Sequence, residues 1–183
     1  MTRLMSQLLD IAADQHGFVT TDNAKEIGVD PTQLRLLCAR GQMERRTRGV
    51  YFVPHFGIDE KTEFQEAVLW AKGRGVIAAE SALALWDLAD ANPRRMSLVV
   101  PPEYNPRRQG REKYRVERRV LPDSEVTWMD GIPVTTPKQS IQDAHDRGTD
   151  RNLLRQAIET ALDRGLITAA EGLELTHVLK DSR

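Results

Sequence analysis

The sequence predicts an α+β fold in two domains, residues 1–54 and residues 60–183, and three observations lead to this prediction. First, apolar residues recur at helical spacing through residues 3–41, with capping residues between the runs. Second, a short alternating segment follows and stops at Pro54. Third, helical segments beyond residue 60 are interspersed with strand-like runs and an Asp-Gly turn.

The N-terminal domain begins with three expected helices. The first covers residues 3–14, where Leu, Ile and Ala recur on one helical face. A short second helix is expected over residues 21–27, after a capping threonine. The third covers residues 31–40, because Asp30 is a favourable N-cap residue and Pro31 suits the first helical position.

A hairpin is expected directly after these helices. Its strands are Met43–Arg46 and Val50–Val53, joined by a turn near Gly49 and ended by Pro54. Two helices separated by a glycine turn and followed by a hairpin form a winged helix-turn-helix. In that arrangement the third helix enters the major groove of DNA, and the hairpin, or wing, lies along the sugar–phosphate backbone.

The residue types on these elements suit DNA. Gln33 and Arg35 can hydrogen-bond base edges, and Thr32 can reach a phosphate or a thymine methyl group. Arginines on the wing would pair with phosphates and make binding salt-dependent. Tyr51 would either pack under the wing or touch the sugar–phosphate chain. A protein-interaction module with a merely solvated hairpin is the alternative. The candidate DNA-binding residues are Thr32, Gln33, Arg35, Arg40, Arg45, Arg46, Arg48 and Tyr51.

The formal net charge of −1 conceals a strongly basic segment. Residues 94–119 contain nine lysines and arginines and three acidic residues, a net charge of +6. Such a segment is a solvated face, a second surface for phosphates, or a site for an acidic partner. The candidate residues of this second basic surface are Arg107, Arg108, Arg111, Lys113 and Arg115.

The C-terminal domain is expected to mix helices and strands. An Asp130-Gly131 pair between two apolar runs is a strong hairpin signal. Thr136 followed by Pro137 predicts a capped helix start, and Thr168 with Glu171 forms a capping-box pattern. The expected elements are helices within 58–75 and 76–90, strands within 95–104 and 104–121, a hairpin over 124–136, and helices within 136–148 and 150–181, the last divided in two.

Nothing in the sequence indicates catalysis or a cofactor. A glycine-rich phosphate loop and a nucleophile elbow are both absent. Asp143, His145 and Asp146 could in principle bind a metal or share a proton, but a solvated helix face is the favoured interpretation. One cysteine and four scattered histidines show no zinc-binding spacing. The three tryptophans are interpreted as packing residues, with base stacking as the alternative; they are Trp70, Trp86 and Trp128. An enzyme, nuclease-like, whose site forms only on folding therefore stays open as an alternative.

A cytoplasmic location is expected. No apolar run approaches the ~20 residues that span a bilayer, and the first residues do not resemble a signal peptide. The only cysteine, Cys38, leaves no internal disulfide and suits a reducing compartment.

Several motifs follow one another in a set order along the chain. They are the wing end RRTRGVY at 45–51, SALALWDLAD at 81–90, MSLVVPPEY at 96–104 and AIETALDRGLITAAE at 157–171. Between the last two lies the segment that begins IPVTTP, with Ile132, Pro133, Val134, Thr135, Thr136, Pro137, Ser140, Ile141 and Asp143. The order of these motifs resembles the AbiEi antitoxin family of bacterial type IV toxin–antitoxin systems.

The resemblance implies a winged-helix repressor that binds inverted repeats of double-stranded DNA in its own operon's promoter. It also implies a C-terminal domain that contributes to cooperative repression and to neutralising a nucleotidyltransferase toxin, without requiring a stable complex. Two protomers on one inverted repeat would raise the affinity, because a single module buries only ~600–1,000 Å².

Overall fold

The structure, a computed structural model, describes residues 3–181, so the outermost ends of both predicted domains lie outside the described residues. The chain divides into two compact units. The N-terminal unit comprises Met1–Arg74 together with Pro106–Arg111, and the C-terminal unit comprises Gly75–Asn105 together with Glu112–Arg183. This division differs from the predicted domains 1–54 and 60–183, because residues beyond the wing pack onto the N-terminal sheet.

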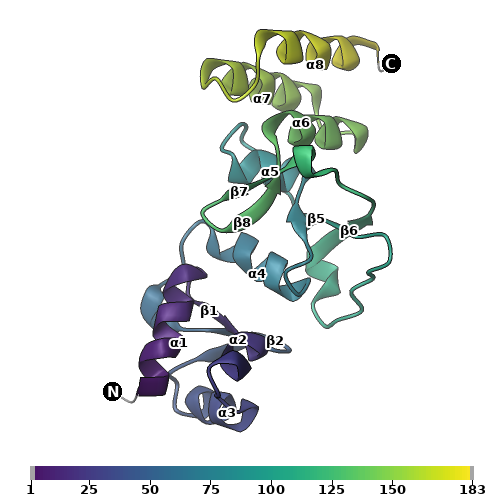
Figure 1. Cartoon of the computed structure of the whole chain (residues 1–183). Coiled ribbons are helices and arrows are strands. Elements are labelled where there is room, and N and C mark those ends of the chain that lie inside the picture. The colour runs from purple at the N-terminus through teal and green to yellow at the C-terminus, as the bar shows by residue number, and fades with distance from the viewer. Residues whose placement is uncertain (1–2, 182–183) are drawn as a thin grey trace. The chain divides into compact units, whose positions relative to one another are not determined.

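The N-terminal unit is a winged helix-turn-helix extended by one further helix (Figure 1). Its three-stranded sheet has the order β1-β3-β2, and both pairs are antiparallel. The predicted helices and hairpin are confirmed, with small shifts at their ends. The elements are α1 (Arg3–Asp14), β1 (Phe18–Thr20), α2 (Thr21–Glu26), α3 (Pro31–Ala39), β2 (Glu44–Thr47), β3 (Val50–Phe52), the 3₁₀ turn Pro54–Phe56 and α4 (Thr62–Trp70).

Reciprocal caps start α2 and α3. The Thr20 hydroxyl accepts from the Asn23 backbone N–H, and the Asn23 side chain accepts from the Thr20 N–H. Asp30 and Gln33 repeat the arrangement at α3, where Pro31 occupies the first turn. Each cap supplies partners to backbone groups that the helix itself leaves unpaired. These helix starts are therefore determined locally.

Helix α4 belongs to the N-terminal unit because it covers the sheet formed by β1 and β3. Leu69 packs in one buried cluster with Phe18, Val50 and Phe52. The rings of Phe18 and Phe52 lie 5.2 Å apart, centroid to centroid, at a tilted angle. Residues 55–74 thus complete the core of the winged domain.

The C-terminal unit is built on a five-stranded sheet with the order β6-β5-β4-β8-β7. The pairs β5–β6 and β4–β8 are parallel, whereas β4–β5 and β7–β8 are antiparallel. The predicted hairpin turn at Asp130-Gly131 is confirmed between β7 and β8. The strands are β4 (Val76–Ile77), β5 (Met96–Val100), β6 (Tyr114–Arg118), β7 (Val126–Met129) and β8 (Ile132–Thr135).

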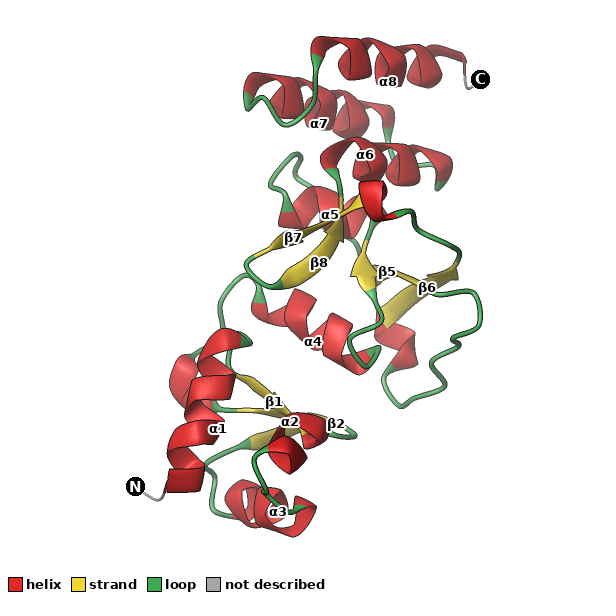
Figure 2. Cartoon of the chain, in the orientation of Figure 1, coloured by secondary structure: helices red, strands yellow, loops and turns green. Residues whose placement is uncertain are grey.

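Four helices among the described residues complete this unit, and each packs against the next one along the chain (Figure 2). A buried cluster that includes Leu83, Ile141, Leu154 and Ile167 joins them. Thr168 and Glu171 form the predicted capping box at the start of the last helix, and Thr136 caps α6 as predicted. The helices are α5 (Ala79–Leu85), α6 (Pro137–Asp146), α7 (Arg151–Asp163) and α8 (Ala169–Asp181).

The predicted helix over residues 76–90 is too long at its start. Val76 and Ile77 form β4, which pairs with β5 on one side and with β8 on the other. Strand pairing by residues distant in sequence overrides helical spacing here. The helix therefore begins only at Ala79.

Candidate nucleic-acid interface

The face of α3 opposite the core is exposed and carries the predicted recognition residues. Leu34 is fully buried, whereas Thr32, Arg35 and Arg40 are exposed. Leu36 is 50% exposed on the same helix. An exposed aliphatic side chain among polar ones can contact a thymine methyl group in a major groove. The sequence analysis did not name Leu36 as a candidate.

Gln33 also has a structural role, which the sequence analysis did not assign to it. Its side-chain oxygen accepts from the Asp30 backbone N–H at 2.9 Å, and the Asp30 carboxylate accepts from the Thr32 N–H at 2.6 Å. Hydrogen bonds from the side chain and the backbone of Thr32 lower the pKa of the Asp30 carboxyl group. Because the carbonyl oxygen of the Gln33 amide serves as a cap, its NH₂ group is the part of the amide left to donate to other groups.

The wing hairpin presents exposed cations. Arg45 and Arg48 are both exposed, and the turn between β2 and β3 contains Gly49 with φ of +77°. A Cβ at Gly49 would lie 3.2 Å from the Thr21 hydroxyl oxygen, so the turn passes close to the start of α2. The Thr21 N–H donates to the Gly49 carbonyl at 2.9 Å, which ties the wing tip to the helical part of the unit.

Arg46 is engaged within the protein. Its Nε donates to the Glu66 carboxylate at 3.0 Å, and its guanidinium lies 5.7 Å from the centre of the Phe52 ring. Glu66 is only 8% exposed. A register shift between Arg45 and Thr47 marks a β-bulge at this point, and bulges change the direction of a side chain. In this structure Arg46 forms an ion pair with Glu66 of α4, and its contact with a phosphate stays a prediction.

Tyr51 is buried, with 6% of its surface exposed, and packs in the core of the N-terminal unit. Of the two interpretations of Tyr51, this burial favours packing under the wing over contact with the sugar–phosphate chain.

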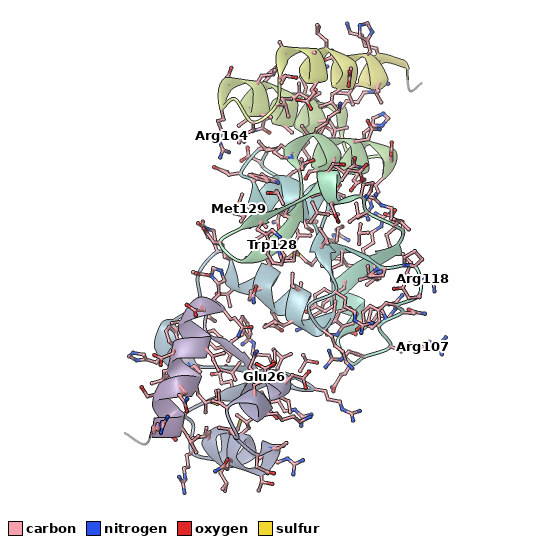
Figure 3. All side chains as sticks on the ribbon, in the orientation of Figure 1. Glu26, Arg107, Arg118, Trp128, Met129 and Arg164 are labelled. Atoms are coloured by element: carbon pink, nitrogen blue, oxygen red, sulfur yellow. The ribbon has the colours of Figure 1, made fainter. Side chains whose placement is uncertain are left out.

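The residues of the predicted second basic surface fall in different units. Arg107, Arg108 and Arg111 belong to the N-terminal unit, whereas Lys113 and Arg115 belong to the C-terminal unit. Arg107 is exposed and extends outward from its loop (Figure 3). Arg111 is also exposed, and its side chain donates to the Pro106 carbonyl at 3.2 Å. The net charge of +6 is therefore not one continuous surface of a single unit.

The interpretation of the acidic residues of α6 as a solvated face is wrong for Asp143 and correct for Asp146. Asp143 is 7% exposed, and both of its oxygens accept from Arg119 Nη2 at 2.7 Å. Burial raises the pKa of Asp143, while the Gln139 hydrogen bond and the Arg119 charge oppose the rise. Asp143 therefore acts as a structural partner of Arg119. Asp146 is exposed, as predicted.

The tryptophans divide between core and surface. Trp70 is 1% exposed, and the Trp86 indole donates to the Thr135 carbonyl at 2.9 Å. Trp128, labelled in Figure 3, is 68% exposed on β7, so its interpretation as a packing residue is wrong. As the last strand in the sheet order, β7 has a partner on one side only.

Within residues 3–181, no three His, Cys, Asp or Glu side chains are grouped so as to hold a metal ion. A groove of about 610 Å³ in the C-terminal unit is lined by Lys138 and Glu171 among others. Lys138 is paired with Glu174 at 2.7 Å, and Glu171 caps the last helix. None of the described helices has the length and apolar character needed to cross a bilayer.

The fold and the exposed residues of α3 and the wing define a winged-helix transcriptional regulator. The sequence matches the family model described as "Transcriptional regulator, AbiEi antitoxin" over residues 6–54. It also matches the one described as "AbiEi antitoxin C-terminal domain" over residues 73–179, more than half of the chain. The chain therefore belongs to the AbiEi antitoxin family, which confirms the resemblance drawn from its motifs.

Other comparisons add little. The crystal structure of the RV2827C protein from Mycobacterium tuberculosis is similar at 13% sequence identity with a TM-score of 0.47, over 97% of this chain and 82% of that one. Likeness at this level supports no functional inference. Among curated proteins, none matches this sequence.

Proposed function

We propose that this protein binds inverted repeats in the promoter of its own operon and represses transcription there. The observation that carries the proposal is the exposure of Thr32 and Arg35 on α3, of Arg40 directly after it, and of Arg45 and Arg48 on the wing of the same unit. Arginine recognises guanine through two parallel hydrogen bonds, and wing arginines neutralise phosphates. The proposed binding to promoter DNA also implies a cytoplasmic location.

Two protomers on one inverted repeat would supply the affinity that one small module lacks. A symmetric operator presents the same half-site to each copy, and the half-sites would lie one helical turn or a multiple of it apart. The spacing of protected phosphates in a footprint would report this geometry.

The proposed second activity is neutralisation of a nucleotidyltransferase-type toxin through the C-terminal unit. Membership of the AbiEi antitoxin family supports this part of the proposal. The protein would act by binding and regulation, without catalysis of its own. Coexpression with a nucleotidyltransferase encoded next to it tests this activity, because growth should recover only when the C-terminal unit is present.

The DNA-binding proposal is tested by a gel shift with the DNA directly upstream of the gene, against a scrambled duplex, at two salt concentrations. Specific and salt-sensitive retention is expected, since each phosphate contact changes the slope of log K against log salt by about 0.9. Equal retention of both duplexes would overturn the proposal and favour a protein-interaction role for the wing.

A further inference from the structure

The segment Pro106–Arg111 connects β5 to β6, yet it packs in the N-terminal unit. Arg108 holds it there. Its Nη1 donates to the Trp70 carbonyl at 2.5 Å, and its Nη2 donates to the Arg48 carbonyl at the wing tip. One planar guanidinium thus joins the end of α4 to the turn of the hairpin.

The rest of the segment is anchored as well. The Trp70 indole N–H donates to the Gln109 carbonyl at 2.9 Å, and Trp70 itself is 1% exposed. Pro106 is buried, and its carbonyl accepts from Arg111. Because Trp70 is fixed in the core, Arg108 has a fixed support from which to hold the wing.

We propose that Arg108 is a positioning residue for DNA binding, which holds the Arg48 backbone so that the Arg48 side chain meets a phosphate. The inference rests on the proposed function of the wing. Arg108 is partly buried, and its two terminal nitrogens already donate to backbone carbonyls. Two of the five N–H donors of this guanidinium are thereby committed to backbone carbonyls of the N-terminal unit. The connection between β5 and β6 therefore contributes to the DNA-binding unit.

The test is a double-mutant cycle in the full-length protein, with binding to the upstream duplex measured at several salt concentrations. Arg48→Ala should weaken binding about fivefold at 0.15 M salt and lower the salt slope by about 0.9. Arg108→Ala should do the same. The double variant should match either single variant, because both remove the same phosphate contact.

Arg108→Lys separates positioning from direct contact. Lysine keeps the charge, and a point charge suffices for a phosphate, but an ammonium cannot reproduce the fork between two carbonyls. Arg108→Lys should therefore bind as weakly as Arg108→Ala. Arg107→Ala is the matched control in the same segment, and its effect should multiply with that of Arg48→Ala.

Three results would overturn the proposal: full rescue by Arg108→Lys, multiplied losses in the Arg48–Arg108 double variant, or unchanged binding by Arg108→Ala. Amide hydrogen exchange without DNA separately tests whether the Arg108 hydrogen bonds hold the wing tip. Both Arg108 variants should speed exchange in residues 47–50, and Arg107→Ala should not. The wild type could show the expected exchange result and yet not prefer its upstream duplex. That outcome would reject the proposed function, although Arg108 would still hold the wing tip.

Discussion

The wing and the region of β6 both contain two consecutive arginines, and the pairs are arranged alike. Arg45 is exposed and Arg46 is bound to buried Glu66. In the same way, Arg118 is exposed and Arg119 is bound to buried Asp143. Successive side chains of an extended segment point to opposite faces, so only one arginine of each pair is directed toward its buried carboxylate.

The two pairs differ in what surrounds the ion-paired arginine. Arg46 has Glu66 at 3.0 Å and Glu44 at 3.6 Å. Arg119 lies between three carboxylates, those of Asp143, Glu117 and Glu125. Arg46 and Arg119 are therefore engaged in ion pairs within their own units, and a count of arginines alone does not reveal these ion pairs.

The largest expected effect is that of Arg119→Ala. It leaves the buried Asp143 carboxylate without its ion-pair partner, so the free energy of unfolding should fall by about 2–3 kcal/mol. Urea denaturation followed by circular dichroism measures the loss. Arg118→Ala is the matched control and should stay within about 0.5 kcal/mol of the wild type. Equal losses in the two variants would contradict the assignment of Arg119 as the ion-paired member.

Arg35→Ala on α3 tests what the exposed arginines do. Loss of a bidentate contact to guanine should reduce discrimination at one base position by about 1–3 kcal/mol. Arg45→Ala on the wing should instead weaken binding to all sequences and lower the salt slope by about 0.9. Binding to a set of single-base operator variants separates the two outcomes. If Arg35→Ala behaved as Arg45→Ala does, α3 would not be the recognition helix.

A smaller stability effect is expected in the wing. Arg46→Ala removes the partner of Glu66, and we expect the N-terminal unit to lose about 1–2 kcal/mol of stability. Hydrogen exchange of the β3 amides reports this local stability. Arg45→Ala, one residue earlier, should leave the exchange unchanged. A wing that exchanges equally in both variants would show that Arg46 is not needed to hold it.

The smallest effect concerns pH. Burial raises the pKa of Asp143 above its usual value, against the Gln139 hydrogen bond and the Arg119 charge. The folded protein thus binds this proton more tightly than the unfolded chain does. Its contribution to stability is fully present below the unfolded pKa, about 3.9, and declines as the pH rises through the folded pKa.

Asp143→Asn does not titrate and should lack this decline. Unfolding free energies of both proteins between pH 3.5 and about 7, a range that brackets the usual carboxylate pKa, measure the difference. The advantage of the wild type over Asp143→Asn should shrink as the pH rises. An advantage that grows instead would mean that the Arg119 ion pair outweighs the burial of the carboxylate.

The amino-acid sequence by itself determined the elements whose signals are local. Asp30 with Pro31 marks the start of α3, Asp130-Gly131 marks the β7–β8 turn, and Thr168 with Glu171 marks the start of α8. In each case the interacting groups lie within a few residues of one another, so their spacing carries the information. The exposed face of α3 followed from helical spacing in the same way.

Only the tertiary structure decided which cations are free and where the winged unit ends. Arg46 meets Glu66 twenty residues away, and Arg108 meets Arg48 sixty residues away. Strand β4 likewise exists through pairing with β5 and β8, although Val76 and Ile77 follow a helical pattern in sequence. Partners so distant leave no periodic signal in the chain, because folding alone brings them into contact.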